Sequence, residues 1–234
     1  MGCHEGPRWE TDGLKWCVDP ASSKSYSGSG SDVYDLSSGN YSSTITSATH
    51  NGTGPKSFVF AANPDRIETS SSTWWTTPTS MSVSTWFKMT GGGGTYRTVI
   101  HKSNTGATSV GSSQFWTGIT AAGTLCATIG AATGGIGWAA GNTTTTGTLD
   151  IWWNLAAVWN GANVRVFING VYNKQYDLGE YPVGDYAVRV GASGDAGTYQ
   201  VIGKIPMVTA NHNVALSDEQ VAQNFDTHKS RFGL

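Results

Sequence analysis

"WWNLAAVWNGANVRVFING" spans Trp152 to Gly170 and contains two Asn-Gly pairs, Asn160-Gly161 and Asn169-Gly170. Apolar residues alternate with other residues between the pairs, which is the pattern of half-buried strands. Asn-Gly between such runs is a strong hairpin signal, because both central residues of a type I′ turn need positive φ. This stretch therefore predicts antiparallel strands that double back through tight turns.

The same alternation occurs along most of the chain. In "MSVSTWFKM" the side chains of Met81, Val83, Thr85 and Phe87 fall on one face. Further runs of this kind, separated by turn signals, predict roughly a dozen short strands. Strands at this spacing are typical of a sandwich or a barrel.

The C-terminal end follows a helical pattern instead. In "ALSDEQVAQNFDTHK" Ser217 is placed as the N-cap, and Gln220 completes a capping box. Leu216 and Val221 occupy the positions of a hydrophobic staple. We expect one short helix here, with Phe225 on the stripe that docks on a sheet.

The composition agrees with an all-β domain. The chain has 234 residues, of which 38% are hydrophobic and only 13% charged, against roughly 25% charged in ordinary soluble domains. Its 31 glycines and abundant Ser, Thr and Asn favour strands and turns over helices. No linker or repeat divides the chain. We predict an N-terminal arm over residues 1–12 and a single domain over residues 13–234.

Charge and hydropathy argue against several functions. The net charge is −2 without a basic stripe, so we expect no nucleic-acid partner. No apolar run reaches the ~18 residues of a membrane span, and the first ten residues contain no secretory signal. We therefore expect synthesis in a cytoplasm. Cys3, Cys17 and Cys126 lack metal or redox spacing and are expected to be free thiols.

Aromatic residues near predicted loops are candidates for carbohydrate contacts. An aromatic face covers the apolar side of a pyranose, and amides bind its hydroxyls. Tyr96 lies among these aromatics. The candidate carbohydrate-binding residues are Trp74, Trp75, Trp116, Trp138, Tyr199, Asn104 and Asn142. Packing in the core or at an interface remains the other interpretation of each.

Metal chemistry has less support. The histidines are scattered without ligand spacing on one element. Asp185 and Asp195 lie in loops and are weak candidates for Ca²⁺, which prefers oxygen ligands. Solvated loop aspartates are the other interpretation. Apart from this calcium hypothesis, we expect no cofactor.

The order of the segments resembles a known superfamily. "STWFKM", "TVIHKS", "WWNLAAVWNGANVRVFINGV", "YAVRVGAS", "VIGKIPMV" and "VALSDEQVAQNF" follow one another as in the laminin G-like, concanavalin A-like lectin/glucanase superfamily. The opening "DGLKWCVDPASSKSYSGSGSDVYDLSS" and the closing "HKSRFGL" resemble the version found in structural proteins of tailed bacteriophages. The resemblance implies an all-β fold: a jelly-roll β-sandwich of two antiparallel sheets with one short C-terminal helix.

Two departures from that family concern calcium. The family often has an Asp shortly after the Gly-Lys-Ile of its penultimate strand, where this chain has Pro206. It often has Asp-Gly after an early Phe, where this chain has Ala61-Ala62. Both losses count against a calcium site of the family type.

The resemblance implies a non-enzymatic virion structural protein, in head decoration, a fibre or a tail-associated position. Its partners would be other virion subunits in a homo-oligomeric or multi-copy assembly, with a host-surface glycan as a further ligand. Trp9 would anchor the arm on a neighbour. A soluble carbohydrate-binding module or lectin is the alternative. A glycoside hydrolase comes third, because the nearest match to the glucanase motif Glu-x-Asp-x-x-Glu is Glu10-Thr11-Asp12, followed by Lys15.

Overall fold

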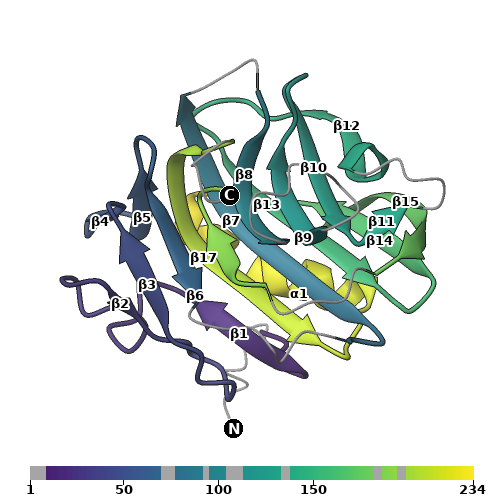
Figure 1. Ribbon diagram of the computed structural model, residues 1–234, viewed down its shortest axis with the longest axis horizontal. Helices are drawn as coiled ribbons and strands as arrows, with labels where there is room; N and C mark the ends of the chain where they lie inside the picture. The colour runs from purple at the N-terminus through teal and green to yellow at the C-terminus, as the bar shows by residue number, and fades with distance from the viewer. Residues whose placement is uncertain are drawn as a thin grey trace, which may run out of the picture.

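The chain forms two stacked antiparallel sheets with one helix packed on the outside (Figure 1). The structure, a computed structural model, describes residues 9–69, 77–91, 95–103, 113–132, 138–181, 186–193 and 199–234. The all-β, jelly-roll-like sandwich with a short C-terminal helix is confirmed.

The larger sheet has nine strands among the described residues. In spatial order they are β11 (Ala131–Ala132), β15 (Val171–Glu180), β14 (Asn163–Ile168), β13 (Trp152–Trp159), β7 (Met81–Gly91), β17 (Ile202–His212), β5 (Ser57–Phe60) and β4 (Thr49–Asn51). β1 (Leu14–Val18) also pairs with β17. The central neighbours β7, β13 and β17 come from distant parts of the chain, so long-range pairing defines this sheet.

The smaller sheet has eight strands among the described residues. Their order is β12 (Asn142–Thr146), β10 (Thr124–Ile129), β9 (Ser113–Ile119), β8 (Arg97–Ser103), β16 (Val188–Val190), β6 (Arg66–Thr69), β3 (Ser43–Thr46) and β2 (Asp32–Val33). The Thr-rich segment that ends at Thr146 is thus an edge strand.

The core lies between the two sheets and follows the predicted alternation. Met81, Val83 and Phe87 of β7 point into it, and so do Leu155 and Ala157 of β13. From the smaller sheet the core receives Phe115, Ile119, Leu125, Ile129, Val188 and Val190. Because side chains alternate across a strand, the intervening residues face outward and form the two outer surfaces of the sandwich.

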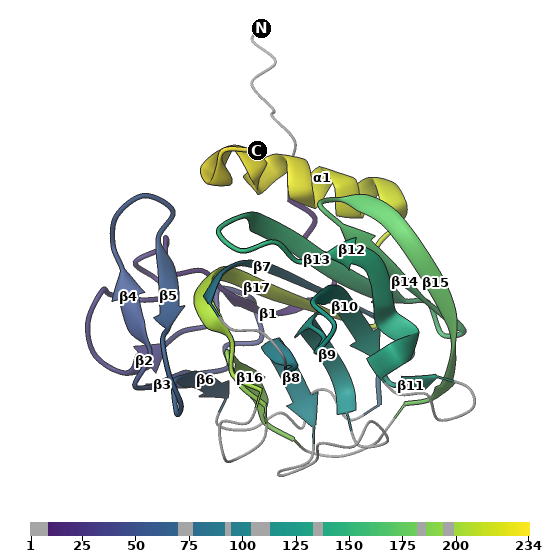
Figure 2. The same cartoon turned by 90° about the horizontal axis from the view of Figure 1, so that it is seen from above.

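The helix α1 (Asp218–Lys229) covers the outer face of the nine-stranded sheet (Figure 2). The capping box between Ser217 and Gln220 is formed as predicted, and Leu216 and Val221 share one apolar cluster. The short helix η4 (Ser230–Phe232) continues from α1. Phe232 and Phe225 stack on Trp86, with ring centroids 4.2 and 5.3 Å away. The outward-facing Trp86 is thereby buried.

The two Asn-Gly turns differ. Asn169 and Gly170 both have positive φ, at 49° and 75°, as the type I′ prediction requires. At the other turn only Gly161 has positive φ. There the Asn160 Oδ1 accepts hydrogen bonds from the backbone N–H groups of Ala162 and Asn163. The type I′ prediction is therefore wrong at Asn160-Gly161, because the Asn side chain stabilises a longer loop.

The described end of the N-terminal arm docks on α1 of its own chain. Trp9 stands edge-on to His228 with ring centroids 5.6 Å apart. The Glu10 N–H donates to Asn224 Oδ1 at 2.7 Å, and Gln220 Nε2 donates to Glu10 Oε2 at 2.9 Å. The expectation that Trp9 anchors the arm on a neighbouring subunit remains a prediction. Residues 1–8 lie outside the described part of the chain.

Candidate functional site

Three aromatic rings gather on the outer face of the eight-stranded sheet. Trp116 of β9 alternates with the core residue Phe115 and so points away from the core. Tyr96 and Tyr199 pack against it. The ring centroids of Tyr96 and Trp116 are 6.1 Å apart, and those of Tyr96 and Tyr199 are 5.8 Å apart. Trp116 is 0% exposed, whereas both tyrosines are half-buried. We call these three residues the aromatic cluster.

Backbone contacts fix Tyr199 beside β8. The Thr98 N–H donates to the Tyr199 carbonyl oxygen at 2.8 Å, and Thr98 forms a parallel bridge with Gln200. Tyr199 has φ of 63°, which is uncommon for a residue with a side chain. Trp116 Nε1 donates to Thr98 Oγ1 at 2.8 Å. Thr98 therefore ties both Trp116 and Tyr199 to the same strand position.

A layer of buried polar residues adjoins the aromatic cluster. His101 pairs across strands with Trp116 on one side and Arg189 on the other. Arg189 Nη2 lies 3.1 Å from Glu68 Oε1, and Arg66 Nε lies 2.9 Å from Glu68 Oε2. The carboxylate of Glu68 is thus held between two guanidinium groups.

Burial and charge shift the titration of this layer. Burial, helped by the charge of Arg189, lowers the pKa of His101 to about 3. Burial would raise the pKa of Glu68, but hydrogen bonds from Arg189 and Arg66 outweigh it and lower that pKa. At neutral pH the layer therefore contains a neutral imidazole and an ionised carboxylate.

The structure brings some predicted carbohydrate residues together. Trp116 and Tyr199 are in one cluster, and Asn142 pairs with Cys126, which packs on Trp116. Asn142 Oδ1 is buried and accepts no hydrogen bond within the described part of the chain. Because Trp116 has no exposed face, we assign it the support of the tyrosines rather than direct contact with a ligand.

The other predicted site residues cannot be placed in this way. Trp138 begins the short helix η3 (Trp138–Gly141), and its side chain is outside the described structure. The remaining candidates lie outside the described residues: Trp74, Trp75, Asn104, Asp185 and Asp195. The carbohydrate and calcium hypotheses for these positions stay predictions.

Sequence reasoning missed the polar partners of the aromatic cluster. Gln200 is buried, and its Nε2 donates to the Asp65 carbonyl oxygen at 2.6 Å. A signal for the polar layer was present, because His101 and Arg189 stand inside otherwise apolar strands. Charged residues inside a strand need a partner when buried, but the sequence does not identify Glu68 as that partner.

The positions that bear on a calcium site offer little to a cation. Asp65 Oδ2 accepts hydrogen bonds from the N–H groups of Ala61 and Ala62, at 2.7 and 3.1 Å. Pro206 supplies no carboxylate. These residues do not fit a calcium site of the family type. Among the described residues no group of three or more His, Cys, Asp or Glu could hold a metal ion.

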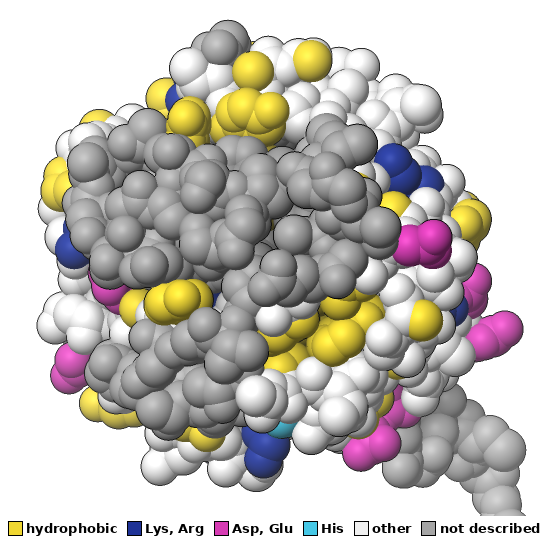
Figure 3. Space-filling model, turned by 45° about the vertical axis from the view of Figure 1, so that its right-hand side comes forward, with side chains coloured by type: hydrophobic (Ala, Val, Ile, Leu, Met, Phe, Trp, Pro, Cys, Tyr) yellow, Lys and Arg dark blue, Asp and Glu magenta, His cyan; other side chains and the backbone are white. Residues whose placement is uncertain are grey.

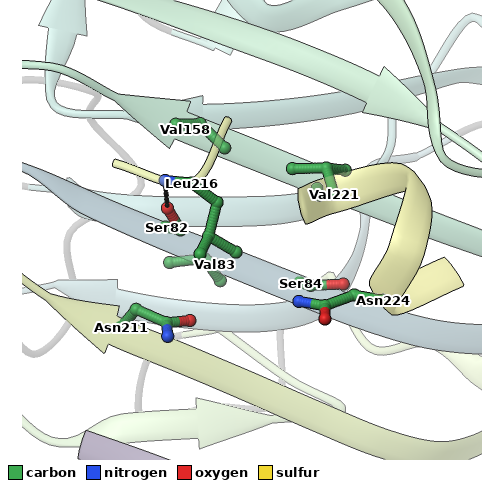
Figure 4. A pocket seen from close by; sticks show the side chains of 9 residues that line it. Ser82, Val83, Ser84, Val158, Asn211, Leu216, Val221 and Asn224 are labelled. Carbon is green, nitrogen blue, oxygen red and sulfur yellow. Dashed lines mark hydrogen bonds between the residues drawn. The ribbon is translucent and has the colours of Figure 1, made fainter. Parts of the chain in front are cut away.

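A small cavity lies between α1 and the nine-stranded sheet (Figure 4). Its volume is about 10 Å³, about the space that one water molecule requires. The N–H of Leu216 donates to Ser82 Oγ beside it at 3.0 Å. The lining residues are Ser82, Val83, Ser84, Ala156, Val158, Asn211, Leu216, Val221 and Asn224. This is a packing gap too small for an organic ligand.

The described surface carries few charges on the face shown in Figure 3, where Lys, Arg, Asp and Glu are scattered among uncharged side chains. None of the helices in the described residues is long and apolar enough to span a membrane.

The sequence comparison decides the family. The family model described as the concanavalin A-like lectin/glucanases superfamily matches residues 61–222, more than half of the chain. The chain belongs to the concanavalin A-like lectin/glucanases superfamily. The match covers most strands of this lectin-like domain, including β8 and β9 below the aromatic cluster. No match was found among curated proteins.

Solved structures share the fold of this concanavalin A-like domain at low sequence identity. The binding domain of botulinum neurotoxin DC in complex with SialylT has a TM-score of 0.63 and 14% identity, covering 93% of this chain and 52% of that chain. A Trypanosoma rangeli sialidase with 2,3-difluorosialic acid has a TM-score of 0.68 and 10% identity, covering 97% of this chain and 35% of that chain. This chain thus spans about half or a third of those proteins, and the likeness shows the fold alone.

Proposed function

We propose that this chain is a non-enzymatic structural protein of a tailed-phage virion that binds glycans through the aromatic cluster. It would act in head decoration, a fibre or a tail-associated position. The observation that carries the binding function is the pair of half-exposed tyrosines, Tyr96 and Tyr199, held over the fully buried Trp116.

The aromatic cluster has the chemistry that sugar binding needs. A tyrosine ring covers the apolar C–H face of a pyranose, and its hydroxyl bonds to water or to the ligand. Arg97, which is half-buried, neighbours Tyr96 and donates from Nη1 to the Gln200 carbonyl oxygen at 3.4 Å. A small number of fixed polar groups beside aromatic rings is typical of ligand sites.

The carboxylates of the described structure favour binding over catalysis. A glycosidase acid needs a raised pKa and a second carboxylate about 5–9.5 Å away. The pKa of Glu68 is lowered instead, by its two arginine partners. Glu10 bonds to Gln220 of α1, on the outer face of the opposite sheet. Neither carboxylate is prepared for general acid catalysis.

The virion role is supported by the order of the sequence segments and by the surface chemistry. A surface with 13% charged residues suits repeated contacts between copies, because charges are depleted in the cores of interfaces. The sandwich also packs a continuous core without relying on bonds between its buried cysteines, Cys17 and Cys126, which are free thiols. Such a domain is suited to a multi-copy particle.

Glycan binding is tested with labelled protein on a glycan array. We expect Tyr96→Ala and Tyr199→Ala to weaken binding about tenfold or more, the loss of roughly 1.4 kcal/mol. Tyr34→Ala is the matched control, because Tyr34 is 51% exposed and belongs to another part of the sheet, next to β2. Equal binding by wild type and Tyr199→Ala, with folding intact, contradicts the site.

The virion role is tested by mass spectrometry of purified particles. We expect this chain at many copies per particle. If it binds glycans but is absent from particles, the alternative of a soluble carbohydrate-binding module or lectin replaces the virion role. That alternative is favoured by the same aromatic cluster, so only the particle measurement separates the two.

A further inference from the structure

The angle between the two tyrosine rings limits the shape of the ligand. Tyr96 and Tyr199 meet at 80° with centroids 5.8 Å apart. This is the distance of direct edge-to-face contact between aromatic rings. The rings therefore form a corner and leave no room for a sugar between them.

An extended glycan chain needs a different arrangement. Successive sugars of a chain lie along a surface, so a chain-binding site needs rings that face the same way and are separated by more than a direct contact. Stacking platforms for linear polymers use successive aromatic faces in this manner. Trp116, the third ring of the cluster, cannot extend the surface, because it is 0% exposed and meets Tyr96 at 75°.

The corner is fixed before any ligand binds. Thr98 bonds to the Tyr199 carbonyl oxygen and to the Trp116 indole. Gln200 is held by its hydrogen bond to the Asp65 carbonyl oxygen. The strand that carries Tyr96 is thus joined to the segment that carries Tyr199 at consecutive residues. A rearrangement to coplanar rings would break these bonds.

We propose that the aromatic cluster recognises a single terminal pyranose at the end of a glycan, not an internal stretch of polysaccharide. This inference rests on the proposed glycan-binding function. The apolar face of the sugar lies on one tyrosine ring and its edge meets the other. A sugar linked on both sides would direct one neighbour into the second ring.

The test uses the wild-type protein and two probes. The first is a panel of methyl glycosides of hexoses, N-acetylhexosamines and sialic acid as competitors. The second is a set of array glycans before and after an exoglycosidase removes the terminal sugar. We expect one methyl glycoside to compete within about threefold of the best oligosaccharide, and trimming to weaken binding about tenfold.

The outcomes separate this inference from the proposed function. If affinity rises about tenfold with chain length, or survives removal of the terminal sugar, the inference is wrong while glycan binding stands. If no glycan binds, or if Tyr199→Ala binds as the wild type does, the proposed function fails and the inference fails with it.

Discussion

Gly118 shows how a single position supports the aromatic cluster. A Cβ at this residue of β9 would overlap the Arg97 carbonyl oxygen and lie 2.8 Å from Trp116 Cζ2. The backbone of β8 and the indole ring both occupy the space that any side chain would need. Glycine is therefore required here by close approach.

We predict that Gly118→Ala lowers the free energy of unfolding by about 1–3 kcal/mol. The added methyl group must push β8 or Trp116 away, so glycan binding should weaken as well. Urea denaturation measures the first effect. Gly52→Ala is the control, because a Cβ there meets only His50 Cε1, at 3.8 Å. Equal stability of the two variants contradicts the close-approach argument.

His101 gives the buried polar layer a dependence on pH. Its pKa is about 3 in the folded chain and 6.5 as a model value for the unfolded chain. The unfolded chain thus binds a proton at a pH where the folded chain does not. The contribution of neutral His101 to stability is complete above pH 6.5 and is lost as the pH falls toward 3.

We predict that the free energy of unfolding falls by up to about 1.4 kcal/mol per pH unit below pH 6.5 because of His101. Urea midpoints between pH 7 and 5 measure this, since the lowered pKa of Glu68 starts from 4.5 and acts at lower pH. His101→Gln should flatten the slope. His212→Gln, which removes a less buried histidine, should change it less. An unchanged slope in His101→Gln would sink the assignment.

Among the elements, α1 depends on contacts at its two ends. At the N-terminus Ser217 Oγ accepts from the Gln220 N–H at 3.2 Å, and Gln220 Oε1 accepts from the Ser217 N–H at 2.8 Å. Asp218 forms an ion pair with Arg165 of β14. At the other end Arg231 bonds to both oxygens of Asp19, at 2.7 and 2.9 Å. The apolar contacts of the helix include Val221, which is buried.

We predict that Ser217→Ala lowers the free energy of unfolding by about 1 kcal/mol, because two backbone N–H groups lose their partners. Thermal denaturation followed by circular dichroism measures the change. Ser230→Ala at the C-cap is the matched control, since only the backbone of Ser230 takes part in that cap. A loss of similar size in both variants would mean that the side chain of Ser217 contributes nothing specific.

At the scale of the whole molecule, one core joins both sheets. Residues of β7 and β13 share it with residues of β9 and β10. Cys17 lies in the nine-stranded sheet and Cys126 in the eight-stranded sheet, and both are buried. Burial raises the pKa of each thiol, and the charges of Asp19 and Asp35 raise that of Cys17 further. These thiols therefore report on the two sheets separately.

We predict that Cys17 and Cys126 resist alkylation in the native protein and become reactive at the same urea concentration. A single domain over residues 13–234 unfolds both sheets together. The experiment uses Cys3→Ser to remove the third thiol, with mass spectrometry to assign the labelled peptides. Two well-separated midpoints would show that the sheets are independent units.

The sequence by itself determined the local features of this protein. Alternation in β7, β13 and β14 identified which side chains enter the core, because the period of a strand is fixed by its backbone. The cap at Ser217 and the turn at Asn169-Gly170 were also predictable, since each depends on residues close in sequence.

The tertiary structure decided what depends on distant neighbours. Tyr96 meets Tyr199 only because residues 199 and 200 return to β8. Trp116, predicted from sequence as a sugar contact, is instead fully buried. At Asn160-Gly161 the side chain of Asn160 selected another turn. Pairing between strands far apart in the chain depends on the total packing of both sheets, which no short stretch of sequence encodes.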